Sequence, residues 1–317
     1  MIKTNLIYKK LGMWLFLTVL LWCVALIEVH AQQEPQYTQY MFNMMSVNPA
    51  YAGTRDGLNA LFLSRIQWVG VDGAPRSNTF ALHTPVKDKK IGLGVSVITD
   101  RIGPVNNTYL NLNYAHRLNI SEKHTLSLGL KGGILNYHAG LADVDLNEFD
   151  ESFASDLRKN LQPNLGVGAY FYSKDYYAGI SVPKLIKTDL ETGSTSNTIG
   201  ELKRHFFITA GYVYAVNSMW KLKPSFINKM VEGAPMSLDI TAQALYRERF
   251  WLGTTYRIGD AISLLFDVQA NRQLKIGYSY DITTSQMSKV TNGTHEILIS
   301  YNFAGFAVNK VKSPRYF

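Results

Sequence analysis

The sequence is almost free of cysteine: among 317 residues the single thiol is that of Cys23, which lies in an apolar run near the N-terminus. The rest of the chain therefore has no disulfide, no thiolate nucleophile and no metal site built on cysteine. After this first run no second stretch of about 18 or more apolar residues follows, which excludes a second spanning helix. Any membrane crossing by the main part of the chain must then use strands.

Recognisable catalytic motifs are also missing. Gly92-x-Gly94 lacks the third glycine and the following helix of a dinucleotide-binding turn, and we interpret it as two small residues in a crowded strand. His295-Glu296 has no second histidine at the spacing of a zinc protease, which leaves a polar pair at the start of a strand. The sequence therefore predicts no catalytic residue, no cofactor and no enzyme.

One acidic segment resembles part of a calcium-binding loop. Asp143-x-Asp145-x-Asn147 matches the first ligands of that loop, but Glu148 replaces the turn glycine and Ala154 stands where the bidentate glutamate belongs. A solvated surface loop is the favoured interpretation, and ion binding by this segment stays open. We predict no metal ligand from it.

Residues 1–31 have the features of a signal peptide. Lysines precede an apolar run from Leu11 to Ile27, and polar residues close the run just before the small residue Ala31. Lipidation at Cys23 is disfavoured because the bulky Trp22 stands beside it. The mature chain is expected to begin near residue 32 and to be exported.

The chain has few acidic residues relative to basic ones, with a net charge of +8 and a pI near 9.3. An exported protein does not meet chromosomal DNA, and the basic residues are scattered rather than grouped in a block. Solvated turns and a polar barrel interior account for them, so we predict no nucleic-acid partner.

What the sequence does have is period-two alternation from Leu58 onward. Large apolar residues alternate with small or polar ones in segments of about ten residues, which is typical of outer-membrane barrel strands. We predict an all-β fold, a transmembrane antiparallel β-barrel of about 14 strands over residues 58–303, followed by a tail, 304–317. The predicted strands are 58–68, 77–84, 91–99, 107–118, 123–137, 164–172, 176–183, 204–216, 220–229, 236–246, 250–258, 261–270, 273–282 and 294–303.

The alternation also assigns the two faces of the wall. The bulky apolar set is expected to contact outer-membrane lipid, and the charged residues take the opposite face. The predicted lipid-facing residues include Leu93, Val95, Leu112, Leu128 and Ile240. A soluble β-sandwich alternates in the same way, so the pattern alone does not decide between water and lipid outside.

The lengths of the connections favour the barrel. Short polar connections such as 173–175 and 247–249 alternate with longer ones such as 138–163 and 184–203, and bacterial barrels place short turns in the periplasm and long loops outside the cell. Aromatic residues crowd the short turns and predict an interfacial girdle. These residues are Tyr172, Tyr176, Tyr177, Tyr214, Trp220, Tyr246, Phe250 and Trp251.

Residues 32–57 form a segment of a different kind. It is too short for a strand pair, yet its tyrosine, phenylalanine and methionine side chains are too apolar for a free tail. Asn48-Pro49 gives a turn and Gly53 gives flexibility, so the segment can fold back. We expect it to pack within or against the periplasmic mouth of the barrel, either as a simple strap or with a role in handling a partner.

Three stretches resemble the PorP/SprF membrane proteins of type IX secretion and gliding. They are Gln36-Tyr37-Thr38-Gln39-Tyr40-Met41-Phe42-Asn43 continuing to Asn48-Pro49-Ala50-Tyr51-Ala52-Gly53-Thr54-Arg55; Lys275-Ile276-Gly277-Tyr278-Ser279-Tyr280-Asp281 with Gly293-Thr294-His295-Glu296-Ile297; and Ser313-Pro314-Arg315-Tyr316-Phe317. With Arg65, Gln67 and Trp68, the match spans essentially the whole mature chain.

The resemblance implies an outer-membrane barrel that assists export or surface attachment of a secreted client, often an adhesin, by binding the client's C-terminal domain beside other type IX components. It would not be the main translocation pore. The candidate partner-binding residues are Tyr37, Tyr40, Met41, Phe42, Asn43, Asn48, Pro49 and Tyr51. An alternative is a diffusion channel or uptake porin, with 138–163 folded inward and Lys131, Arg257 and Lys275 lining the pore.

Overall fold

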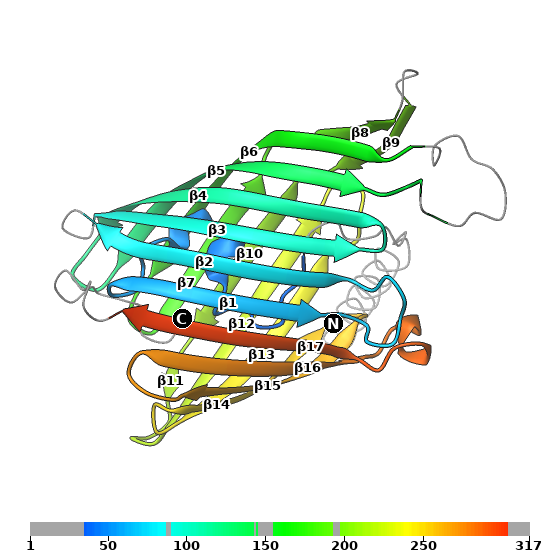
Figure 1. Cartoon of the computed structure of the whole chain (residues 1–317). Coiled ribbons are helices and arrows are strands. Elements are labelled where there is room, and N and C mark those ends of the chain that lie inside the picture. Colours follow the sequence, from blue (N-terminus) through cyan, green and yellow to red (C-terminus); the bar gives the residue numbers. More distant parts are fainter. Residues whose placement is uncertain (1–34, 87–89, 143, 145–154, 193–196, 304–317) are drawn as a thin grey trace, which may run out of the picture.

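The computed structural model describes residues 35–86, 90–142, 144, 155–192 and 197–303, and these form a closed antiparallel β-barrel (Figure 1). Fourteen wall strands follow one another around the barrel, β10 and β11 counting as one, and β10 pairs with β12 to complete the ring. The prediction of an antiparallel barrel of about 14 strands is confirmed. The wall strands are β1 (Leu58–Ile66), β2 (Arg76–Val86), β3 (Ile91–Ile102), β4 (Val105–Asn119), β5 (Thr125–Ala139), β6 (Leu157–Tyr172), β7 (Tyr176–Lys184), β10 (His205–Tyr212), β11 (Tyr214–Ala215), β12 (Trp220–Val231), β13 (Ser237–Tyr246), β14 (Phe250–Arg257), β15 (Ala261–Gln269), β16 (Leu274–Thr283) and β17 (Thr294–Phe303).

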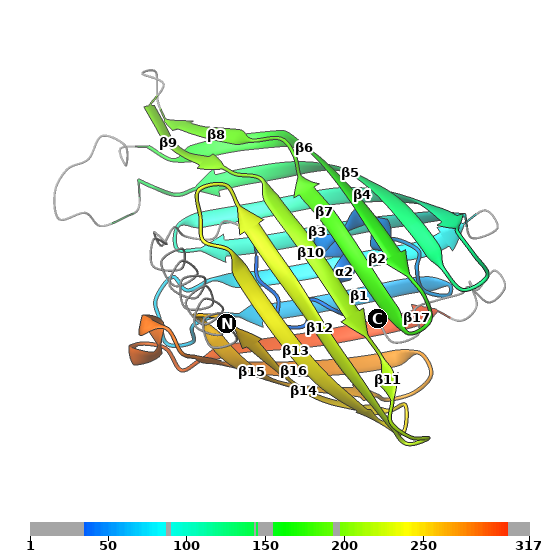
Figure 2. The same cartoon turned by 180° about the vertical axis from the view of Figure 1, so that it is seen from behind.

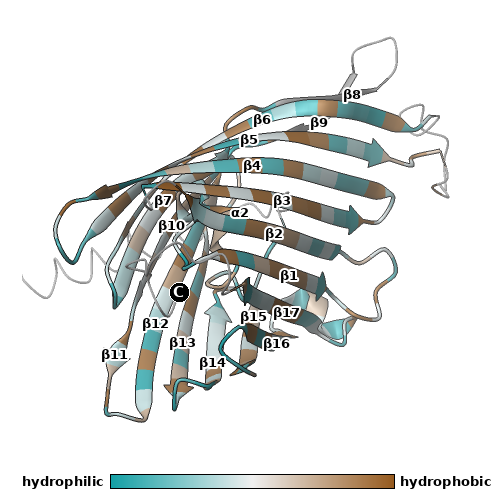
Figure 3. Cartoon of the chain, turned by 60° about the vertical axis from the view of Figure 1, so that its left-hand side comes forward, coloured by the Kyte–Doolittle hydropathy of each residue, from teal (hydrophilic) through white to brown (hydrophobic). Residues whose placement is uncertain are grey.

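Hydrophobic and hydrophilic residues alternate along the strands (Figure 3). Burial alternates in the same way, so successive side chains face the lumen and the outer surface in turn. Leu93, Leu112, Leu128 and Ile240 point outward with 44%, 63%, 46% and 50% of their surface exposed, and Val95 lies on the same face. Among the residues described, no helix is long and apolar enough to cross a membrane. Large apolar residues therefore face the surroundings of the barrel, and most charged residues in the middle of the strands turn inward, whereas strand-end charges such as Arg76, Arg101 and Arg158 are exposed.

A single outward position gives a direct test of this face. Leu264 lies near the middle of β15 and is 55% exposed. In a bilayer, Leu264→Arg should lower the free energy of unfolding by about 2–4 kcal/mol, because arginine is costly on a lipid-facing site near the midplane. Urea titration of the protein in lipid vesicles measures the change, with Leu264→Phe as the apolar control. Equal midpoints for the two variants would place this face away from lipid.

The predicted strand 204–216 is interrupted between β10 and β11. By register, Pro224 of β12 lies opposite Tyr212, next to the interruption at Val213. Proline has no backbone N–H, so it cannot donate to the neighbouring strand at this point. The backbone N–H of Val213 instead donates to the carbonyl oxygen of Asp175 at 2.6 Å.

The two ends of the barrel differ (Figures 1 and 2). The short-turn end carries connections such as 173–175 and 247–249, and the long-loop end carries the hairpin β8 (Thr188–Thr192) and β9 (Asn197–Leu202) together with the 3-10 helix η3 (Gln286–Lys289). Not every connection at the long-loop end is long, since only Gly103 and Pro104 join β3 to β4.

Two predicted loops contain more strand than the sequence suggested. Part of 138–163 belongs to β5 and β6, and 184–203 contains the β8–β9 hairpin. The start of β6 was missed because Pro163 interrupts the pattern, but pairing of β6 with β7 begins only at Val167. The missing N–H of Pro163 is therefore tolerated beside a single partner strand, β5. The calcium-like positions Asp143, Asp145, Asn147, Glu148 and Ala154 all lie outside the described residues, as do the predicted signal peptide and the predicted tail.

The predicted aromatic girdle is wrong for three of its eight members. Tyr172, Tyr177 and Trp251 are 2%, 2% and 5% exposed and point into the lumen. Adjacent strand residues face opposite sides, so in Phe250-Trp251 only the first ring reaches the outer surface. Crowding of aromatics near a turn therefore reflects two separate sets, one of them inside the barrel.

Candidate functional site: a lumen filled by an N-terminal segment

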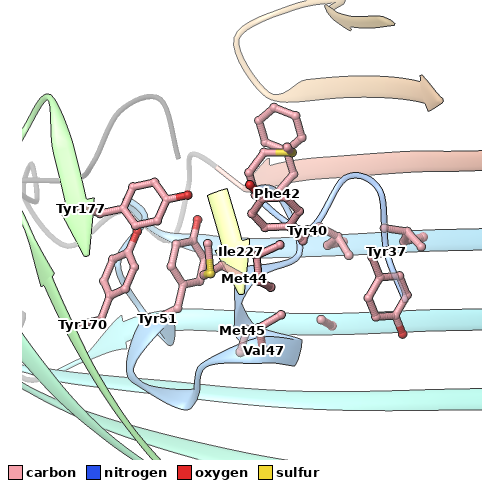
Figure 4. Close-up of a cluster of buried hydrophobic side chains, with 14 of the residues drawn as sticks. Tyr37, Tyr40, Phe42, Met44, Met45, Val47, Tyr51, Tyr170, Tyr177 and Ile227 are labelled. Carbon is pink, nitrogen blue, oxygen red and sulfur yellow. The ribbon is translucent and has the colours of Figure 1, made fainter. Parts of the chain in front are cut away.

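Residues 35–54, which we call the lumen segment, lie inside the barrel (Figures 1 and 4). The segment contains one helical turn, α2 (Met44–Val47), and a short 3-10 helix, η1 (Pro49–Tyr51). Its apolar side chains form a buried cluster with residues of the surrounding wall. The lumen segment thus joins wall residues into one buried cluster, while a second, smaller cluster that includes Tyr109 and Tyr137 forms without it.

The segment runs along the lumen from the long-loop half to the short-turn end. Thr38 contacts Asp281 and Glu296, which lie near the long-loop ends of β16 and β17. At the other end, Gly53 donates its backbone N–H to His83 Nδ1 at 3.1 Å, and its carbonyl oxygen accepts a 2.6 Å hydrogen bond from Arg117. The segment therefore runs through the lumen and is not confined to one mouth of the barrel, because its polar anchors are spread along the wall.

The eight candidate partner-binding residues all fall in this segment, and all are buried. Their exposure does not exceed 5% for any residue with a quoted value, and Pro49 is buried in η1. They are Tyr37, Tyr40, Met41, Phe42, Asn43, Asn48, Pro49 and Tyr51. The structure thus brings the whole set together on one segment but turns the set toward the barrel wall.

A buried ion cluster holds the start of the segment. The Arg65 guanidinium of β1 lies 2.8 Å from the Asp281 carboxylate and 3.2 Å from that of Glu296. The backbone N–H groups of Thr38 and Gln39 donate to the two Glu296 oxygens at 3.0 and 2.7 Å. We call these five residues the latch. Buried charges are tolerated when they are paired and fully hydrogen-bonded, as the carboxylates are here.

A second ion cluster continues from the latch across the lumen. Arg257 donates to the Asp239 carboxylate at 3.1 Å, and Lys229 donates to the same group at 3.1 Å. Arg257 also approaches Asp260 at 3.3 Å and Asp281 of the latch at 3.9 Å. The two clusters therefore form one continuous network near the long-loop end.

Phe42 lies among cationic and aromatic wall residues in the middle of the segment. The Lys275 ammonium lies 3.0 Å from the centre of the Phe42 ring, and the Lys223 ammonium lies 5.0 Å from it. The Trp251 ring meets Phe42 edge to face at 6.2 Å. Cation–π contacts are strongest when desolvated, so these buried lysines stabilise the ring in place.

Tyrosines complete the packing (Figure 4). The Tyr51 ring meets Tyr170 edge to face at 5.7 Å, and Tyr170 stacks on Tyr177 at 5.4 Å. The Tyr40 hydroxyl donates to Ser225 at 3.2 Å. Burial raises the pKa of Tyr40 above its usual value, opposed by hydrogen bonds to Ser225 and Thr241, so the hydroxyl keeps its proton.

Glycines in the wall make room for the segment. A Cβ at Gly129 would collide with the backbone of Pro49 and Ala50, and a Cβ at Gly92 with the carbonyl of Ala52. At Gly168, a Cβ would collide with the Asn48 side chain. The crowded-strand interpretation of Gly92 holds in this sense, although the crowding comes from the lumen segment and not from the wall.

The family of type IX secretion system membrane proteins PorP/SprF matches residues 29–301 of this chain. The chain belongs to this family. As a PorP/SprF protein with a strand-built barrel, it is an outer-membrane β-barrel, and the resemblance seen in the sequence is confirmed.

Solved structures of other outer-membrane proteins are similar to this PorP/SprF chain. The Ralstonia pickettii toluene transporter TbuX has 10% identity and a TM-score of 0.49, covering 81% of this chain and 92% of its own. A Pseudomonas aeruginosa FadL homologue has 12% identity and a TM-score of 0.44, covering 85% and 95%. No curated protein matches the chain.

Two sequence interpretations of this PorP/SprF barrel need correction. Lys131, Arg257 and Lys275 do face the lumen, but at 7%, 1% and 6% exposure they are buried there, and the last two are engaged with Asp239 and Phe42. Glu296, interpreted as part of an ordinary polar pair, is fully buried and holds the latch. Its position on the lumen face of the last strand was the signal available in the sequence.

Proposed function

We propose that this PorP/SprF barrel assists export or surface attachment of a secreted client protein, such as an adhesin, by binding the client's C-terminal domain beside other type IX secretion components. The family match over residues 29–301 carries the proposal. The filled lumen supports it, because a polypeptide cannot pass where Met41, Met44 and Tyr51 are already packed against the wall. The barrel then serves as a docking component and not as the conduit.

The lumen segment contributes while it stays in place. Its candidate residues are buried, so in this state they support the wall from inside the lumen and do not contact the client directly. The client instead contacts the exposed residues at one end of the barrel. If the segment left the lumen, the latch carboxylates would lose hydrogen-bond partners and a cluster of aromatic rings would become exposed. The free-energy cost of these two changes exceeds what binding of the client at one surface would supply. Accordingly, the segment is a permanent part of the docking platform.

A disulfide tests whether the segment must move. Asn48 lies against Gly168, and the mature chain without residues 1–31 contains no other cysteine, so Asn48→Cys with Gly168→Cys gives one designed crosslink. We expect the oxidised protein to display the client on the cell surface at the level of its reduced form. Whole-cell immunolabelling of the client and non-reducing gels of the barrel measure both quantities.

The single variants Asn48→Cys and Gly168→Cys are the controls, since each carries the substitution without the crosslink. Display that falls only on oxidation would show that the client needs the segment to leave, and the docking model would be wrong. A diffusion channel or uptake porin remains the second candidate because basic residues line the lumen. High, stable ion conductance of the oxidised protein in a planar bilayer would favour that candidate.

A further inference from the structure

An apolar groove of about 600 Å³ lies on the outer wall over β1 to β5. Its lining includes Leu82, Leu93, Val95, Leu112, Tyr114 and Leu130. The registers arrange outward residues in two rungs, with Leu82, Val95, Leu112 and Gly132 in one and Thr84, Leu93, Tyr114 and Leu130 in the other. A hollow of this size is in the range that holds a ligand of roughly drug size.

The groove exists because one rung is incomplete. Gly132 faces outward from β5, and a Cβ added there would meet no atom within 4 Å. The outward residues before it on the same strand, Leu128 and Leu130, are bulky. A missing side chain on an otherwise continuous apolar wall leaves a hollow. In a membrane this hollow is filled by hydrocarbon, because contact between water and apolar surface is unfavourable.

The short-turn end of the groove is polar and basic. The Tyr114 hydroxyl hydrogen-bonds His116 Nδ1 at 3.4 Å, and His116 pairs across the sheet with Ile91. Lys90, directly before Ile91, is exposed. A basic pocket beside an apolar surface at a membrane boundary is the arrangement that recognises an anionic lipid head group.

We propose that this groove binds one phospholipid from the leaflet at the short-turn end, with an acyl chain beside Gly132 and the phosphate beside Lys90 and His116. The occupant is a phospholipid because the groove is apolar along its length and has Lys90 and His116 at its short-turn end, whereas the outward cations of the long-loop end, Arg76 and Arg101, are not part of its lining. This site is independent of the proposed function, since it lies on the opposite face of the wall from the lumen segment.

Photolabelling tests the site. The purified barrel is inserted in vesicles of phosphatidylcholine with a minor share of phosphatidylglycerol that carries a photoreactive acyl chain, and labelled peptides are mapped by mass spectrometry. We expect labelling to concentrate on β2 to β5 and to fall several-fold in Gly132→Leu, which fills the hollow. Thr254→Leu places the same leucine side chain on the exposed outer face of β14 and should leave the pattern unchanged.

The head-group half of the site has its own variant. Lys90→Gln with His116→Gln leaves the groove intact and should reduce the labelling by phosphatidylglycerol but not by a photoreactive phosphatidylcholine. This variant also keeps the test valid if Gly132→Leu fails to assemble, as judged by heat-modifiable gel migration. Even labelling around the whole wall, or labelling that neither variant alters, would overturn the proposal.

Discussion

Gly129→Ala is expected to displace the lumen segment, whereas Gly132→Ala on the same strand should have no effect on it. A Cβ at Gly129 collides with the backbone of Pro49 and Ala50, and backbone cannot rotate away as a side chain can. Overpacking in a tight core costs about 1–3 kcal/mol or more, and here the added atom opposes η1 itself. Limited proteolysis followed by mass spectrometry should show cleavage within residues 35–54 of the Gly129 variant.

Gly132→Ala is a matched control because it makes the same chemical change three residues away, on the outer face, where a Cβ meets nothing within 4 Å. Heat-modifiable gel migration of both variants reports whether the wall has formed. Resistance of residues 35–54 to protease in the Gly129 variant would show that the wall beside η1 tolerates an extra carbon, and that steric contact with η1 does not explain the glycine.

Removal of the central cation of the latch is expected to have the largest effect of any single polar substitution. Arg65→Met leaves the Asp281 and Glu296 carboxylates buried without their main partner, and breaking a buried pair in this way costs about 3–5 kcal/mol. The urea concentration at half-unfolding should fall accordingly. The double variant Arg65→Met with Glu296→Gln should recover part of the loss, because it removes one of the two uncompensated charges.

The exposed pair Lys187–Glu232 at the long-loop end serves as the comparison. Its nitrogen and oxygen are 3.1 Å apart, similar to the latch distances, but both side chains meet solvent. Lys187→Met should therefore leave the unfolding midpoint unchanged within error, since water screens the pair. If Arg65→Met left the unfolding midpoint as unchanged as Lys187→Met, the ion pairs of the latch would contribute nothing measurable to stability despite their short distances.

The strands were predictable from the sequence because alternation is a local property. Every predicted strand overlaps a strand of the wall, and the first begins at Leu58 in both. The start of β6 and the β8–β9 hairpin escaped prediction, because Pro163 interrupts alternation in one and the other lies outside the wall altogether. Their conformations depend on neighbours that the local pattern does not reveal.

The lumen site was predictable in part. The aromatic composition of residues 32–57 indicated packing against the barrel, but its contacts connect positions far apart in the chain, such as Thr38 with Glu296. Identifying Glu296 requires knowing that the last strand closes beside the first, and that Arg65 of β1 then faces it. Contacts between residues so far apart in the chain cannot be predicted from local pattern until the closure of the barrel and the register of its strands are known.

The latch also fixes an order of events during biogenesis. Arg65 belongs to the first wall strand and Glu296 to the last, and these strands pair directly, Arg65 opposite Glu296. The backbone of Thr38 and Gln39 bonds to Glu296 from inside that seam. The lumen segment can therefore bond to Glu296 only after the last strand has paired with the first and closed the ring. Closure of the barrel and packing of the lumen segment are therefore a single late step. A chain truncated before β17 lacks Glu296, the residue to which Thr38 and Gln39 bond.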